Sequence, residues 1–160
     1  MSRPLDSRGS EAEAKKARLQ DLLERHNQRA LETGQRLQGE FFLRLVDEFD
    51  QLDSEWTEVW LTWIYDHLYN RSVLDDKTRV LIVIGECCVL DEQVQLPNHI
   101  RSALHLGATP KEIFEVVLHS HVYAGMPRMI KAMRTYRSLM KDLRLLEVDD
   151  SPFRGDARDP

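Results

Sequence analysis

Two stretches near the middle of the chain decide the fold: TRVLIVIGECC at residues 78–88 and LPNHIRSALHLGATPKEIFEVVLHSHVYAGMP at residues 96–127. Both are apolar enough to form the core of a globular protein. Several titratable side chains interrupt them, and we single out Arg79, Glu86, His99, His119 and Tyr123. Burying such groups costs free energy unless they are paired or used. We therefore look for the chemistry of this chain in these two stretches.

The pattern around these stretches predicts an all-α protein, because no alternation of period two persists anywhere. VLIVIG at residues 80–85 is hydrophobic on every side, which is typical of a central helix. Helix starts are marked by capping side chains and by early prolines, and glycines mark the ends. The expected starts are Asp53, either Asp75 or Asp76, Pro97 and Thr109, and the expected stops or breaks are Gly34, Gly39, Gly107 and Gly125. We expect a single-domain bundle of about seven helices.

The ends of the chain differ in composition from its middle. Residues 1–10 are rich in Ser, Pro and Gly and are expected to be disordered. Residues 11–33 favour one exposed or partner-packed helix. We place an all-helical domain at residues 11–146 and a loose acidic tail at 147–160.

Composition excludes several classes of function. The 160 residues are 42% hydrophobic and 31% charged, which fits a globular protein. A net charge of −5 provides no basic surface for nucleic acid. The sequence shows neither a secretory signal nor the roughly 20 apolar residues needed to span a bilayer. We therefore expect a cytoplasmic protein with no membrane partner.

His99 is the first candidate for catalysis. It follows Pro97 in the first turn of its expected helix, where the positive end of the helix dipole disfavours protonation. A neutral imidazole can act as a general base or accept a hydrogen bond from a substrate. A lone histidine at such a position is, however, more often structural.

Arg79 and Glu86 lie seven residues apart and so share a helix face. They either converge on an anionic ligand or belong to a structural ion-pair network. His119 and Tyr123 also share a face, whereas His121 lies roughly 200° away from His119. No metal-binding motif results, so we expect no metal and no cofactor.

Three tryptophans, Trp56, Trp60 and Trp63, follow one another at spacings of four and three. Such a ridge is more often core or subunit interface than the wall of a substrate pocket. Together with the amphipathic N-terminal helix it predicts a homo-oligomer. The adjacent Cys87 and Cys88 lack the CxxC spacing of a redox site and are interpreted as two small buried hydrophobes.

Four marks lie within residues 74–136: LDDKTR at 74–79, the spacing from His99 to Gly107, PKEIFEVVL at 110–118, and VYAGMP at 122–127. On these marks the segment resembles the carboxymuconolactone decarboxylase family, which shares its fold with the alkyl hydroperoxidase D proteins. The resemblance implies an alkyl hydroperoxidase D-like bundle with a family-like core at residues 54–143.

The resemblance argues against a thiol peroxidase. That branch has a CxxC motif followed by three residues and then its histidine. Placing that histidine at His99 puts Glu92 and Gln95 at the two cysteine positions, and Val80 at the position of the branch's acidic residue. A residual peroxidase using Cys87 or Cys88 stays only as an alternative.

The decarboxylase branch fits better, since Arg79, His99 and the segment Tyr123–Pro127 match it. That branch decarboxylates a lactone acid without metal or organic cofactor and forms trimers or hexamers. His119 and His121 depart from its small or small polar residues, so the substrate is expected to differ.

The resulting hypothesis is a cofactor-independent decarboxylase-type lyase that acts on a lactone acid or related carboxylated metabolite. His99 would exchange the proton, with Glu86 or His119 orienting it. Arg79, Tyr123 and Trp63 would bind the substrate. The alternatives are another acid–base reaction (lactone hydrolysis, isomerisation or cyclisation) and a non-catalytic helical oligomer.

Overall fold

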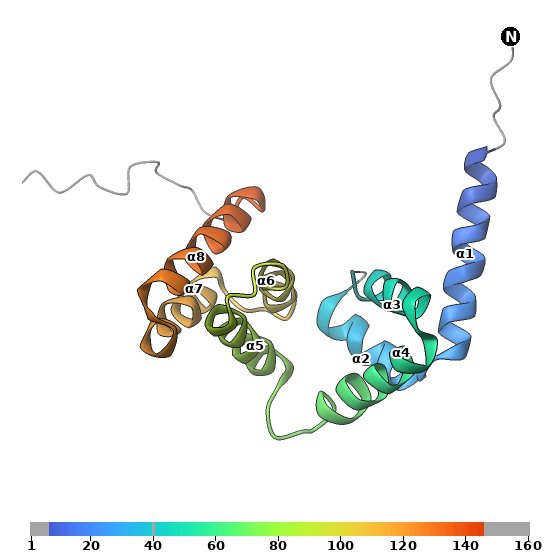
Figure 1. Cartoon of the computed structure of the whole chain (residues 1–160), viewed down its shortest axis with the longest axis horizontal. Helices are drawn as coiled ribbons and strands as arrows, with labels where there is room; N and C mark the ends of the chain where they lie inside the picture. Colours follow the sequence, from blue (N-terminus) through green and yellow to red (C-terminus); the bar gives the residue numbers. More distant parts are fainter. Residues whose placement is uncertain (1–6, 40, 146–160) are drawn as a thin grey trace, which may run out of the picture. The chain divides into compact units, whose positions relative to one another are not determined.

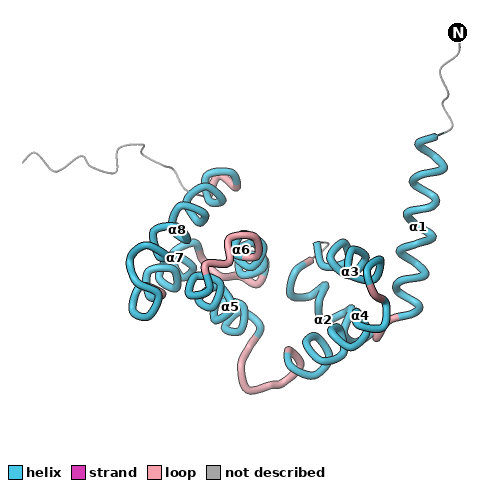
Figure 2. Tube along the Cα trace, viewed as in Figure 1, coloured by secondary structure: helices cyan, strands magenta, loops and turns pink. Residues whose placement is uncertain are grey.

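The computed structural model describes residues 7–39 and 41–145, and every regular element within them is helical (Figure 2). The expected all-α class is therefore confirmed. The described part holds eight α-helices and one π-helix, where the sequence predicts about seven helices. The helices form two compact units that divide between Arg79 and Val80, and each unit is described by itself.

The first unit contains five helical elements, labelled in Figure 1 except for η1. They are α1 (Ser7–Arg25), α2 (Gln28–Gln38), α3 (Phe41–Leu52), α4 (Ser54–Trp60) and the π-helix η1 (Leu61–Leu68). Within the unit, α2 packs against η1 and α3, and α3 packs against α4. Much of α1 projects away from its neighbours, and residues 12–20 are exposed.

Aromatic rings fill the core of this unit. Phe42 is fully buried, with its ring centroid 4.5 Å from that of Tyr65 and 6.2 Å from that of Trp60. Trp56 and Trp60 stack at 6.1 Å. The expected ridge of tryptophans is thus divided: Trp60 lies among buried rings, whereas Trp56 and Trp63 are half or more exposed.

The second unit is built on α6 (Leu96–His105), α7 (Pro110–His119) and α8 (His121–Asp142), with α5 (Asp76–Leu90) entering it from Val80 onward. Helix α8 packs against α6 and α7. The fully buried side chains come from all four helices: Ile84, Cys88, Leu96, Ile100, Ala103, Ile113, Val117, Ala132 and Met140.

Local signals placed most helix starts correctly. The Asp53 side chain accepts a hydrogen bond from the Trp56 N–H, and Asp75 accepts one from the Thr78 N–H. Thr109 and Glu112 form a complete capping box. Pro97 lies in the first turn of α6 as predicted.

Several predicted boundaries are wrong. The single helix expected over residues 11–33 is interrupted before α2, because the Asn27 side chain caps the new helix by accepting the Ala30 N–H. Residues 7–10, expected to be disordered, are helical. Gly34 does not end a helix but lies buried inside α2. Residues 1–6 and the predicted tail 147–160 lie outside the described residues.

The last two helices also differ from expectation. Helix α7 ends at His119 rather than near Tyr123, and α8 begins at His121. The break predicted around residue 125 is present as a kink, since Gly125 has φ 74° and ψ 168°. A positive φ of this size is a conformation that glycine adopts without strain.

Candidate functional site

His99 is held in place by a well-buried helix. Its neighbours Leu96, Ile100 and Ala103 are fully buried in the second unit, so the face of α6 beside it is anchored in the core. The His99 N–H donates to the Gln95 carbonyl oxygen at 3.0 Å. The backbone position of His99 is therefore set by the packing of the helix itself.

The imidazole of His99 is largely buried, and this burial lowers its pKa from the ordinary value of 6.5. The ring is therefore mainly neutral at pH 7, as the sequence suggested, although burial and not the helix dipole is the cause found here. Within residues 7–39 and 41–145 the ring has no hydrogen-bond or ion-pair partner. A neutral, desolvated and unpaired imidazole can accept or deliver a proton.

The other candidate side chains of the second unit are exposed. Glu86, His119 and Tyr123 all face solvent in the single chain, and Tyr123 is 91% exposed. The expectation that these groups are buried is therefore wrong for the isolated chain. Their neighbours on the same helices include exposed apolar side chains: Ile82, Leu90, Leu118, Val122, Met126 and Ile130.

Arg79 and Trp63, which the sequence assigns to substrate binding, lie in the first unit. The Arg79 guanidinium donates to the carbonyl oxygens of Arg71 at 2.8 Å and Leu74 at 3.2 Å. These hydrogen bonds hold the segment between η1 and α5 in place. The Trp63 side chain is 63% exposed, and its ring lies edge-on to that of His67 at 6.4 Å.

Cys87 and Cys88 are buried, and burial raises the pKa of each thiol to about 11. Both thiols therefore stay protonated near neutral pH, where only a thiolate would be a good nucleophile. The interpretation of the pair as small buried side chains fits this environment. Within the described part of the chain, no group of three His, Cys, Asp or Glu side chains is arranged to hold a metal ion.

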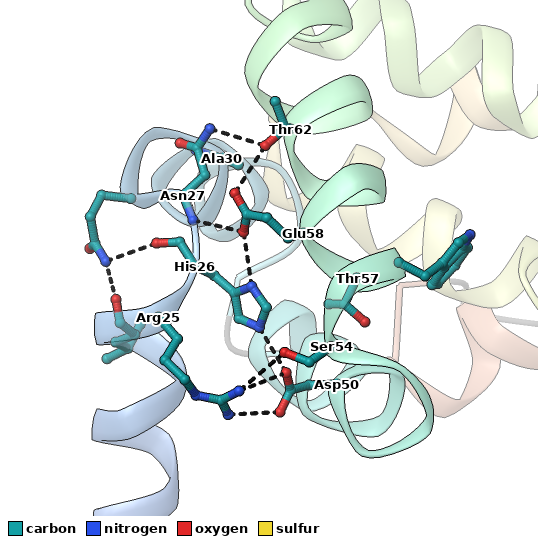
Figure 3. Close-up of polar contacts among 12 residues, drawn as sticks. Arg25, His26, Asn27, Ala30, Asp50, Ser54, Thr57, Glu58 and Thr62 are labelled. Carbon is teal, nitrogen blue, oxygen red and sulfur yellow. Dashed lines mark hydrogen bonds and ion pairs between the residues drawn. The ribbon is translucent and has the colours of Figure 1, made fainter.

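Sequence reasoning missed one polar cluster, at the corner between α1 and α2. Figure 3 shows the His26 ring between two carboxylates, with Nδ1 2.9 Å from Glu58 and Nε2 2.9 Å from Asp50. His26 is 5% exposed and both its nitrogens are occupied, so the geometry assigns it a structural role.

Further bonds extend this cluster and tie four helices together (Figure 3). Arg25 donates to Asp50 at 2.9 Å and to Ser54 at 3.1 Å. The Asn27 N–H donates to Glu58 at 3.1 Å. The sequence offered one signal of the break between α1 and α2: Asn27, a residue type that favours N-cap positions, lies within a helix-forming stretch.

Asp50 gives this cluster a pH dependence. Burial alone would raise the pKa of Asp50, but hydrogen bonds from Ser54, His26 and Arg25, with the charge of Arg25, lower it from 3.8 to about 2. The folded state thus favours the carboxylate. The resulting stability is complete above pH 3.8 and is lost as the pH falls towards 2.

We expect Asp50→Asn to lower the free energy of unfolding by about 2 kcal/mol at pH 7, because the shift in pKa is worth about that much. Urea unfolding at pH 7 and at low pH measures it. The difference from the unsubstituted protein should shrink as the pH approaches 2. Asp142→Asn, at an exposed site, is the control and should change stability by less than about 0.5 kcal/mol. An Asp50→Asn variant as stable as the parent at pH 7 would contradict the assignment.

No helix in the described part is both long enough and apolar enough to cross a membrane. The sequence pattern of the carboxymuconolactone decarboxylase family matches residues 54–137. This range includes Trp63, Arg79, Glu86, His99, His119 and Tyr123. His26 and Asp50 precede this range, and only the cluster residues on α4 and η1 fall within it.

Three relatives give the comparison more detail. An uncharacterized 15.0 kDa protein of Paracoccus denitrificans is 30% identical over 74% of this chain and 93% of its own length. The nitrosuccinic acid decarboxylase of Metarhizium robertsii is 35% identical over 51% of this chain and 57% of its own. The 4-carboxymuconolactone decarboxylase of Acinetobacter baylyi is 33% identical over 55% of this chain and 59% of its own. This chain therefore spans less than two thirds of either decarboxylase. The match over residues 54–137 and the all-helical structure show that the chain belongs to the carboxymuconolactone decarboxylase family.

Proposed function

We propose that this chain is a decarboxylase-type lyase that releases CO₂ from a small carboxylated metabolite, with His99 as its acid–base group. The observation that carries the proposal is the His99 ring, which is largely buried, has a lowered pKa and lacks a partner in the described residues. Membership of a family that includes two named decarboxylases supports the reaction type.

The two named substrates share a chemical property. Nitrosuccinic acid carries a carboxylate on the same carbon as its nitro group, and 4-carboxymuconolactone carries one on a saturated ring carbon attached to the C=C bond that is conjugated with the lactone carbonyl. When the C–COO⁻ bond breaks, its electron pair can move onto a nitro or carbonyl oxygen while CO₂ leaves. A proton must then be added at the carbon. Neither an oxidant nor a reductant is needed.

His99 is suited to the protonation step. A neutral imidazole can relay a proton: its N–H proton passes to the carbon while its other nitrogen takes a proton from water or a neighbouring group, so the ring stays neutral and ends as its other tautomer. A desolvated surrounding also favours loss of a carboxylate, whose charge is stabilised best by water. The low-dielectric environment that lowers the pKa of His99 is of this kind.

The remaining roles stay predictions. Tyr123 would donate to the enolate or nitronate oxygen, and Glu86 or His119 would orient His99. All three are exposed in the single chain, so these roles need another copy to cover them. We therefore propose that the chain works as a homo-oligomer, a trimer or hexamer. The exposed apolar side chains beside Glu86, His119 and Tyr123 on α5, α7 and α8 favour such an assembly. Substrate binding by Arg79 and Trp63 also stays a prediction.

Release of CO₂ is the test that separates the candidate reactions. We expect the purified chain to release CO₂ from one or both of 2-nitrosuccinate and 4-carboxymuconolactone, or from a related acid with a carbanion-stabilising neighbour. Membrane-inlet mass spectrometry with ¹³C-labelled carboxylates measures it directly. Product formed without labelled CO₂ would indicate hydrolysis, isomerisation or cyclisation instead, and an absence of turnover across the panel would favour a non-catalytic assembly.

A further inference from the structure

Two adjoining hollows lie on the first unit, around its π-helix. The first has a volume of about 410 Å³ and is lined by Trp63, His67, Leu68 and Arg71. The second has a volume of about 370 Å³ and is lined by Glu58, Val59, Thr62, Trp63 and His67. Each falls in the size range of small-molecule sites. Because they share Trp63 and His67, the two hollows adjoin, and we call them together the π-helix groove.

The π-helix creates the first hollow. In η1 the hydrogen bonds close five residues back, as in the bond from the Tyr69 N–H to the Ile64 carbonyl oxygen at 2.9 Å. In an ordinary α-helix, Trp63 and Leu68 would project about 140° apart. The wider turn reduces this angle, and both side chains line the same hollow. π-Helical turns of this kind often occur at functional sites.

The first hollow combines an aromatic wall with unpaired polar groups. The guanidinium of Arg71 and the ring nitrogens of His67 have no hydrogen-bond or ion-pair partner among the described residues. The backbone of Arg71 is nonetheless fixed: its N–H donates to Leu68 and its carbonyl accepts from Arg79. An exposed indole and an uncompensated guanidinium that line the same hollow suit a planar ligand with one carboxylate.

The second hollow limits the charge of such a ligand. Its Glu58 carboxylate is already engaged by His26, by the Asn27 N–H and by the Thr62 hydroxyl. Within the described part of the chain, no Lys or Arg side chain lines this end of the groove. A second carboxylate placed here would be repelled, whereas a neutral or hydroxylated end would be accepted. The groove therefore favours monocarboxylates over dicarboxylates.

We propose that the π-helix groove binds an aromatic or unsaturated monocarboxylate, with its ring stacked on Trp63 and its carboxylate paired with Arg71. All residues that line this groove belong to the first unit, and the proposal concerns ligand binding alone, so it does not rest on the proposed decarboxylation. A bidentate bond from guanidinium to carboxylate supplies the specificity, and stacking on the indole supplies the contact area.

Isothermal titration calorimetry of the full chain with 4-hydroxybenzoate tests the proposal. We expect saturable binding with a Kd of about 1 mM or tighter. Arg71→Gln removes the charge and should weaken binding at least about tenfold. Trp63→Leu should weaken it as well. Terephthalate, which carries a second carboxylate at the far end, should bind more weakly than 4-hydroxybenzoate.

Arg44→Gln is the matched control, because Arg44 is exposed on α3 of the same unit and lines neither hollow. It should bind as the parent does, and circular dichroism should show that all variants keep their helicity. Absence of saturable binding, or equal binding by the Arg71→Gln variant, would overturn the proposal. It would also be overturned if Trp63→Leu left binding unchanged but dissociated an oligomer in sedimentation velocity, since the groove would then be an interface between copies.

Discussion

Replacing His99 with glutamine is expected to reduce the rate of CO₂ release by about a hundredfold or more, the usual contribution of a positioned acid–base group. Glutamine has a similar size and keeps hydrogen-bonding capacity, but it cannot exchange a proton near neutral pH. The His99 ring makes no hydrogen bond or ion pair within the described residues, so the substitution should leave the fold intact. Steady-state assay of labelled CO₂, with circular dichroism on the same samples, measures both effects.

The matched control is His105→Gln. His105 lies on the same helix, α6, but is exposed. Its substitution should leave turnover unchanged. Full activity in the His99→Gln variant would remove His99 from the mechanism while leaving a decarboxylase reaction possible through other groups.

The pH dependence of CO₂ release provides a second test of the role of His99. Because burial lowers the pKa of His99 from 6.5, the ring is neutral at all pH values above 6.5 and becomes charged only below it. If the neutral ring is the active form, the rate should fall on the acid side only below pH 6.5. This acid limb should be absent from the residual activity of the His99→Gln variant.

Replacing Gly34 with alanine is expected to lower the free energy of unfolding by roughly 3 kcal/mol, the upper part of the range for overpacked cores. A Cβ at this position would lie 2.1 Å from two atoms of the Phe42 ring. That ring is fully buried and packs on Tyr65 at 4.5 Å, so it has little room to move. Helices α2 and α3 would have to separate. Urea unfolding measures the loss, and a second substitution, Phe42→Leu, should recover part of it.

Gly85→Ala is the control for this substitution. Gly85 also lies within a helix, α5, but the only atom near its added Cβ is Val116 Cγ1 at 3.7 Å, an ordinary contact. Removing glycine from a helix interior should stabilise the protein by about 0.5–1 kcal/mol. If Gly34→Ala were equally harmless, the close packing of α2 against Phe42 would be contradicted.

Local chemistry decided which parts of the fold could be predicted. Asp53, Asp75 and Thr109 cap helices through hydrogen bonds within three residues of themselves, so the sequence alone reveals them. Gly34 was expected to end a helix because glycine is a poor helix former. Its actual role is to leave space for Phe42, a contact across eight positions that no local pattern shows.

The same distinction applies to the polar groups. The neutral state of His99 could be expected from its position at a helix start in an apolar segment, and the lowered pKa agrees with it. The exposure of Glu86 could not be predicted. Hydrophobic neighbours on every side of α5 indicate burial, but one face of that helix is uncovered in the single chain. His26 was missed because Asp50 and Glu58 come from distant positions.

The packing of α2 has a consequence for dissecting this protein. The region shared with the family begins at residue 54, yet Ala30, Leu31 and Leu37 of the preceding α2 are fully or almost fully buried, and α2 packs directly on η1. A fragment trimmed to the shared region would leave Leu61 and Tyr65 facing water. The N-terminal segment thus buries apolar side chains of the region shared with the family. A fragment without this segment would need another partner to bury them before it could fold on its own.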